Sequence, residues 1–86
     1  MANYKIFIKP SAAKELKHLP KKELKRITSK IKSLSEEPRP HGCEKLSAQE
    51  RYRLRQGNYR IVYSIEDEQL FVHVVKVAHR RDVYKK

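Results

Sequence analysis

Four arginines fall within ten residues, in the segment RYRLRQGNYR at positions 51–60. A guanidinium group donates hydrogen bonds from a planar fork that matches the oxygens of a phosphate or a carboxylate. Such a density of arginine in one short segment indicates an anion-binding surface. The four residues are Arg51, Arg53, Arg55 and Arg60.

The same segment has the pattern of a β-hairpin. Apolar residues alternate with polar ones on both sides of Gly57-Asn58, a pair typical of two-residue hairpin turns. This turn places Arg55 directly opposite Arg60, with Arg53 two residues along the same face. Because like charges in that arrangement destabilise a sheet, an anionic ligand explains them better than folding does.

A second group of candidate side chains lies in HRRDVY, after the last apolar segment. Histidine titrates near neutral pH and tyrosine can stack on an unpaired base, so His79 and Tyr84 suit proton transfer and RNA binding. Arg80 and Arg81 add two cations. The alternatives are an exposed histidine at a strand end and a tyrosine that anchors the chain end.

The 86 residues predict one domain, 1–86, with a formal net charge of +11. This charge favours a polyanionic partner, either nucleic acid or an acidic protein. Cys43 is the single cysteine, and no His or Cys cluster has metal-ligand spacing, so we expect neither a metal nor a cofactor. Without a hydrophobic signal segment or a membrane-spanning run, the sequence predicts a soluble cytoplasmic protein.

The elements that must hold these residues follow from the apolar spacing. A strand around Tyr4–Ile8 precedes a short helix capped by Ser11, and a longer helix begins at Lys21 and is ended by Pro38 and Pro40. Residues 41–50 form a connection. The hairpin follows, and an acidic turn at 66–68 leads to a last strand over residues 70–78. The longer helix carries one apolar stripe, formed by Leu24, Ile27, Ile31 and Leu34.

This order, β-α-α-β-β-β, predicts an α+β fold with the αα-hairpin on one face of a small, mainly antiparallel sheet. The last three strands form a meander, and the first joins an edge. Leu54 and Ile61 then face the helices, which leaves the arginines on the open face. The lysines of the longer helix are best explained as a solvated surface, with contact to RNA or an antitoxin as the alternative; they are Lys21, Lys22, Lys25, Lys30 and Lys32.

The segments KLSAQERYRLRQGNYRIVYSI and VVKVAHRRDVY resemble the RelE family of toxins, within the RelE/ParE superfamily of type II toxin–antitoxin modules. This resemblance implies a RelE-like fold and a metal-independent endoribonuclease, an mRNA interferase that cleaves mRNA in the ribosomal A site and inhibits translation. It also implies that the partners are the ribosome, its mRNA and a RelB-like antitoxin that covers the basic face.

The resemblance also assigns roles. It places basic residues of the family at Arg53 and Arg55, an arginine after the turn at Arg60, and another at Arg80, with Arg81 as the alternative. Its C-terminal tyrosine falls on Tyr84. Arginine stands where the best-known members have lysine, and this leaves the general base open.

RNA cleavage by the 2′-hydroxyl needs a base, donors to the phosphate and an acid for the leaving oxygen. We therefore expect Arg60 and Arg80 to stabilise the phosphate and His79 or Tyr84 to transfer protons. The remaining arginines of both segments would bind the RNA backbone: Arg51, Arg53, Arg55 and Arg81. Two other functions remain open, a ParE-like inhibitor of DNA gyrase and a non-catalytic RNA-binding homologue.

Overall fold

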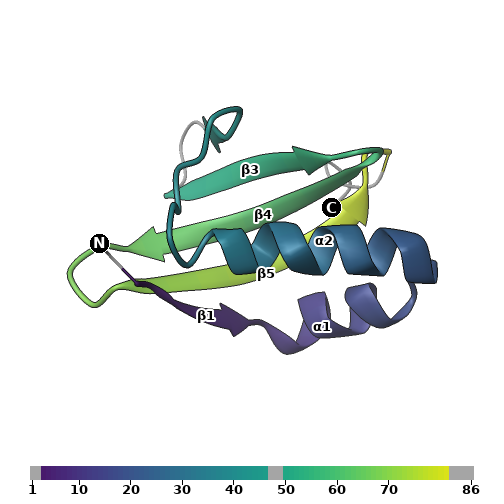
Figure 1. The fold of residues 1–86 in the computed structure, drawn as a ribbon, viewed down its shortest axis with the longest axis horizontal. Helices are drawn as coiled ribbons and strands as arrows, with labels where there is room; N and C mark the ends of the chain where they lie inside the picture. The colour runs from purple at the N-terminus through teal and green to yellow at the C-terminus, as the bar shows by residue number, and fades with distance from the viewer. Residues whose placement is uncertain (1–2, 47–49, 82–86) are drawn as a thin grey trace.

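The computed structural model describes residues 3–46 and 50–81, which form a five-stranded sheet with both helices on one face (Figure 1). The sheet order is β1-β5-β4-β3-β2, in which β1 is parallel to β5 and all other neighbours are antiparallel. The predicted α+β class, the meander and the edge position of the first strand are confirmed. The elements are β1 (Lys5–Ile8), α1 (Pro10–Lys17), α2 (Lys21–Ser33), β2 (Glu44–Leu46), β3 (Arg51–Gln56), β4 (Tyr59–Glu66) and β5 (Phe71–His79).

The core lies between α2 and the middle of the sheet. Ile27, Ile31 and Leu34 of the predicted stripe are buried, whereas Leu24 is half-buried. They share one apolar cluster with Leu54 of β3, Ile61 and Tyr63 of β4, and Val72, Val74 and Val77 of β5. Burial of this stripe fixes which face of β3 and β4 turns towards the helices, and therefore which face carries the arginines.

The predicted hairpin register is confirmed. Gln56 pairs with Tyr59, Arg55 with Arg60 and Leu54 with Ile61. Gly57 has a φ of 61°, a left-handed conformation that glycine adopts without steric cost. The two-residue turn therefore does set two arginines opposite each other.

The helix ends differ from the prediction. α1 begins at Pro10, with Lys9 as its N-cap, and not after Ser11. Proline suits the first helical position because its fixed φ is helical and its missing N–H would have no partner there. α2 ends at Ser33 with Leu34 as its C-cap, before either Pro38 or Pro40 is reached. Within the described part of the chain, no helix has the length and apolar character to span a membrane.

β2 lies inside the segment that was predicted to be only a connection, so the element order gains one strand. Its three residues pair with β3, Glu44 opposite Arg53 and Leu46 opposite Arg51. A strand this short has too few residues to give a recognisable alternation. Its position matters because it brings a carboxylate next to the arginines of β3.

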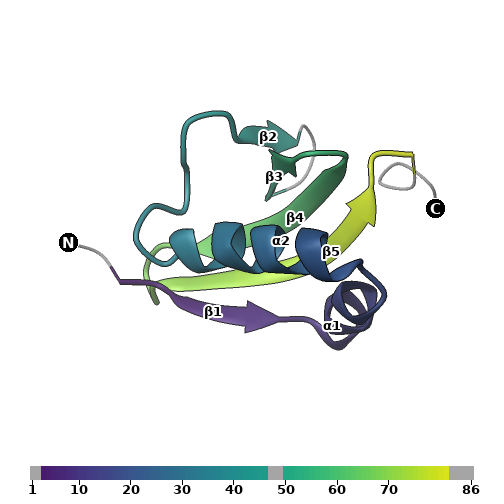
Figure 2. The same ribbon diagram turned by 45° about the vertical axis from the view of Figure 1, so that its right-hand side comes forward.

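α1 continues the line of β1 and lies beside β5 (Figure 2). β1 pairs with residues 71–74, and within the described residues the next part of this β5 edge has no strand neighbour. Glu15 of α1 satisfies this edge, because its Oε1 accepts a hydrogen bond from the Val77 N–H at 2.8 Å. Its Oε2 lies 3.4 Å from the Lys76 Nζ. This contact helps to hold the end of β5, from which Arg80 follows.

Candidate anion-binding site

Arg53, Arg55, Arg60 and Arg80 form the arginine patch, a cluster on the sheet face away from the helices. Along β3 and β4 the first three alternate with the buried Leu54 and Ile61, so their side chains lie on the other face of the sheet. Arg80 joins them from the end of β5, where its backbone N–H donates a 2.7 Å hydrogen bond to the Asn58 carbonyl of the hairpin turn. Two stretches of sequence about twenty residues apart are thereby held side by side.

The electrostatics of Arg60 measure how closely the patch is assembled. Its pKa is lowered, first by partial burial and then by the positive charges of Arg55, Arg53 and Arg80. Each of these cations disfavours the charge on Arg60. An anion bound among them would relieve the repulsion. The patch therefore has the properties of a preorganised anion-binding site.

Arg39 gives the contrasting case of an arginine that serves the fold. Its Nη1 and Nη2 contact the two carboxylate oxygens of Asp67 at 3.0 and 2.9 Å, and its Nε donates to the Tyr52 hydroxyl. Asp67 also accepts a hydrogen bond from the Tyr4 hydroxyl. These contacts raise the pKa of Arg39 and lower that of Asp67 to about 2. Arg39 thus ties the segment after α2 to the β4–β5 turn.

Glu44 is a residue of the site that the sequence analysis did not identify. Its Oε2 lies 2.7 Å from Nη2 of Arg53, and its charge raises the pKa of Arg60, against the lowering by the neighbouring arginines. The Arg53 side chain is only 14% exposed, whereas that of Glu44 is 59% exposed. A carboxylate therefore stands at the border of the arginine patch, open to solvent and held by one of its arginines.

His79 does not join the patch. It pairs with Tyr59 in the register, and the two rings meet edge to face at 5.5 Å. Tyr59 packs against the core, so this ring pair lies on the helix side of the sheet, whereas Ala78 and Arg80 take the alternate positions. His79 therefore lies on the other face of the sheet from the arginines, because successive strand residues point to opposite faces.

The other predicted residues are placed as follows. Arg51 is exposed and alternates with Arg53 on the patch side, but the arginines that most lower the pKa of Arg60 are Arg55, Arg53 and Arg80. Arg81 is exposed and donates its backbone N–H to Nδ1 of His79. Tyr84 lies outside the described residues. No three His, Cys, Asp or Glu side chains in residues 3–46 and 50–81 are grouped to hold a metal ion.

A mixed sheet, helices on one face and an arginine cluster on the other define a class of small, cationic α+β proteins. The chain matches the family described as the ParE toxin of type II toxin–antitoxin systems, parDE, over residues 6–84. It therefore belongs to this family of the RelE/ParE superfamily, and its structural likenesses lie with RelE toxins.

Three solved structures illustrate this likeness. The RelBE2 toxin–antitoxin complex of Mycobacterium tuberculosis has a chain with 28% identity and a TM-score of 0.82, covering 92% of this chain and 100% of that one. The archaeal RelE–RelB complex from Pyrococcus horikoshii OT3 gives 28% identity and a TM-score of 0.83, covering 94% and 99%. The isolated RelE toxin of E. coli gives 26% and 0.77, covering 91% and 84%.

A sequence relative is Toxin RelG of Mycobacterium tuberculosis (strain ATCC 25618 / H37Rv), which is 44% identical over 32 residues. The matched segment spans 37% of this chain and 37% of that toxin. The predicted membership of the RelE group of type II toxins is confirmed by these comparisons together.

Proposed function

We propose that this protein is the toxin of a type II toxin–antitoxin system and that it inhibits translation by cutting mRNA in the ribosomal A site. The observation that carries the proposal is the arginine patch, in which the pKa of Arg60 is lowered by three neighbouring arginines. Guanidinium groups from two separate stretches could each bind one oxygen of the same phosphate. The structural likeness to RelE toxins supports the same function.

In the proposed reaction, the ribose 2′-oxygen attacks the adjacent phosphorus while the bond from phosphorus to the 5′-oxygen of the next nucleotide breaks. The products are a 2′,3′-cyclic phosphate and a free 5′-hydroxyl, whose proton comes from Tyr84 or from water. Arg60 and Arg80 stabilise the negative charge that grows on the phosphate oxygens during the attack. Arg53 and Arg55 hold the neighbouring backbone, and Arg51 and Arg81 extend the cationic surface around them.

Glu44 is our candidate for accepting the proton of the 2′-hydroxyl. Arginine side chains only donate hydrogen bonds, whereas a carboxylate accepts them, and Glu44 is the carboxylate whose charge reaches Arg60. Its contact with Arg53 positions it beside the phosphate site. Tyr84 keeps its proposed role in stacking on a base or in proton transfer. His79 would act only from the helix side of the sheet, next to Tyr59.

The matched family bears the name of ParE, so inhibition of DNA gyrase is the second candidate function. The two candidate functions differ in their need for the arginine patch. Cleavage of mRNA needs arginines aligned on a phosphate, whereas inhibition of gyrase by protein contact does not. The RelB-like antitoxin is the proposed partner in either case, and the proposed location is the cytoplasm.

Primer-extension mapping of an mRNA in a translating extract tests the proposal. We expect discrete, ribosome-dependent cuts with the wild type and their loss in Arg60→Ala and Arg80→Ala, with weaker cuts in Tyr84→Phe. Lys17→Ala, on the exposed surface of α1, is the matched control and should cut as the wild type does. Intact mRNA together with gyrase-dependent DNA breaks would refute the nuclease and support the second candidate.

A further inference from the structure

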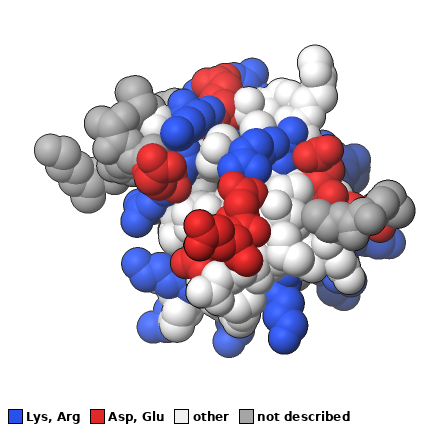
Figure 3. Space-filling model, turned by 90° about the vertical axis from the view of Figure 1, so that its left-hand side faces the viewer, with Lys and Arg blue, Asp and Glu red and all other residues white. Residues whose placement is uncertain are grey.

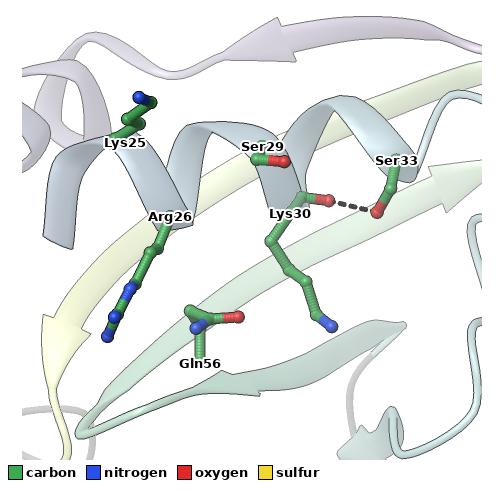
Figure 4. A pocket seen from close by; sticks show the side chains of 6 residues that line it. All are labelled: Lys25, Arg26, Ser29, Lys30, Ser33 and Gln56. Atoms are coloured by element: carbon green, nitrogen blue, oxygen red, sulfur yellow. Dashed lines mark hydrogen bonds between the residues drawn. The ribbon is translucent and has the colours of Figure 1, made fainter. Parts of the chain in front are cut away.

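A groove runs along α2 next to the end of β3, with a volume of ≈ 580 Å³ (Figure 4). In this view Arg26 and Lys30 extend from α2 towards the β3–β4 hairpin, whereas Lys25 points away. Every residue that lines the groove is charged or polar. The lining residues are Lys25, Arg26, Ser29, Lys30 and Ser33 of α2 and Gln56 of β3.

The groove lies at an open edge of the sheet. β2 pairs with β3 only at residues 51–53, so residues 54–56 have no strand on that side within the described residues. In a two-residue hairpin the residues next to the turn bond to each other, and the following pair directs its backbone outward. The backbone N–H of Arg55 therefore points to this edge, as a further donor.

The groove and the arginine patch meet at the open edge of β3. A second hollow of ≈ 340 Å³ lies at the same edge, and Lys30 lines both. Arg53 and Arg55 line this second hollow, together with His41 and Glu44. A ligand that leaves the patch past Arg55 would pass Lys30 and enter the groove along α2.

The cations of the groove are poorly compensated. Lys25 and Lys30 make no ion pair within the described residues, and Arg26 approaches Glu23 only at 3.9 Å. Lys30 is half-buried where it lines the groove. An amphipathic protein segment would meet only the aliphatic stems of lysine and arginine among the lining side chains, with their charges beside them. A sugar–phosphate backbone, which offers regularly spaced anions, fits these cations, hydroxyls and the amide of Gln56 better.

We propose that the groove along α2 binds the backbone of an RNA strand whose neighbouring phosphate lies in the arginine patch. Arg26 and Lys30 contact successive phosphates, and Ser29 and Gln56 donate hydrogen bonds to phosphate or ribose oxygens. This inference rests on the proposed function, and it gives the enzyme a track that holds the RNA on one side of the cut.

The test compares Arg26→Gln/Lys30→Gln with Lys21→Gln/Lys22→Gln, which removes the same charge from the exposed start of α2. The probes are 2′-O-methyl RNAs, which cannot be cleaved: a trinucleotide that fills only the patch, and a strand of about 12 nucleotides that also reaches the groove. We expect the groove variant to bind the long RNA on the order of tenfold more weakly. Its salt slope should fall by about 1.4, or roughly 0.7 for each lost phosphate contact.

The trinucleotide should bind both variants as it binds the wild type, and this also verifies that the groove variant is folded. Equal losses for the two variants would overturn the groove, because they would reflect net charge alone. A glutamate decapeptide serves as a competitor for RNA. If it displaces RNA from the wild type but not from the groove variant, and both proteins bind RNA equally well, the groove would be assigned to an acidic protein instead. The probes measure binding alone, because none of them is cleaved. A failure to cut mRNA would therefore refute the proposed function without changing the conclusion about RNA binding in the groove.

Discussion

Arg39 and Arg60 have the same side chain and opposite electrostatic surroundings. Arg39 forks onto the carboxylate of Asp67, which raises its pKa, whereas Arg60 is surrounded by three cations that lower its pKa. The first arrangement stabilises the fold and the second does not. Counting arginines cannot separate the two roles, but their neighbours can.

The role of Glu44 can be tested with Glu44→Gln, which keeps the shape of the side chain and removes its charge. We expect the cleavage rate on the ribosome to fall on the order of 10²-fold, because the proton acceptor is lost. Binding of a non-cleavable RNA should stay equal or become tighter, since a negative charge leaves the border of the patch. Glu50→Gln, outside the patch, is the control. An unchanged rate in Glu44→Gln would exclude Glu44 as the base.

The Asp67 contact predicts a pH dependence of stability. Its pKa in the folded chain, about 2, lies below the ordinary value of about 3.9, because Arg39 and then Tyr4 donate hydrogen bonds to it. The contact therefore stabilises the fold fully above pH 4 and loses its contribution as the pH falls from about 4 through about 2. We expect Asp67→Asn to unfold at a lower temperature than the wild type at pH 7, with the difference vanishing near pH 2. Glu68→Gln is the control, and its difference in unfolding temperature from the wild type should not change between pH 7 and pH 2. If the difference for Asp67→Asn stayed constant across this pH range, the account would be contradicted.

At the level of elements, one buried hydroxyl fixes the path from α2 to β2. Tyr63 is fully buried, and its hydroxyl donates a 2.7 Å hydrogen bond to the carbonyl of Pro38. Tyr63→Phe would leave that carbonyl without its partner at a cost of about 1–3 kcal/mol. Urea unfolding should report this loss, and cleavage should weaken as well because Glu44 follows Pro38 on the same segment. A variant as stable as the wild type would show that water replaces the hydroxyl.

The hairpin and the α2 stripe were predictable because short-range periodicity fixes them. A two-residue turn sets the register of β3 and β4, and steps of three and four residues set the buried face of α2. β2 was not predictable from three residues. The face of His79 could not be predicted because the β4–β5 register shifts between Val62, paired with Lys76, and Tyr63, paired with Val74, which skips Val75. This extra residue puts His73 and His79 on opposite faces, although six residues separate them.

On the scale of the whole molecule, charge is unevenly distributed. Glu66, Asp67 and Glu68 surround the β4–β5 turn, and Figure 3 shows acidic side chains gathered on that side. β4 runs from Glu66 at this end to Arg60 of the arginine patch, a distance of roughly 20 Å for six steps along a strand. The acidic end therefore lies away from the patch, and the resulting dipole would orient the protein as it approaches a polyanion.

This distribution predicts that an antitoxin neutralises the protein largely through charge. We expect the affinity for the antitoxin that the family implies to fall with added salt, because exposed charges are screened over about 10 Å at 0.1 M. Calorimetric titrations at low and high salt would measure it, with Arg55→Gln reducing the dependence. An affinity that does not respond to salt would point to apolar contacts, such as those that the exposed Phe7 and Ile8 could make.

The central claim is that arginines from two distant stretches act on one phosphate. Single-turnover cleavage of ribosome-bound mRNA by Arg60→Ala, Arg80→Ala and the double variant tests it most directly. Arg80→Ala retains the backbone hydrogen bond to Asn58, so the turn should stay intact. If both residues stabilise the same transition state, each single variant loses on the order of 10²-fold, and the double variant loses much less than the product of the two. Losses that multiply in full would mean that the two arginines act at separate places, and the single-phosphate site would then be wrong.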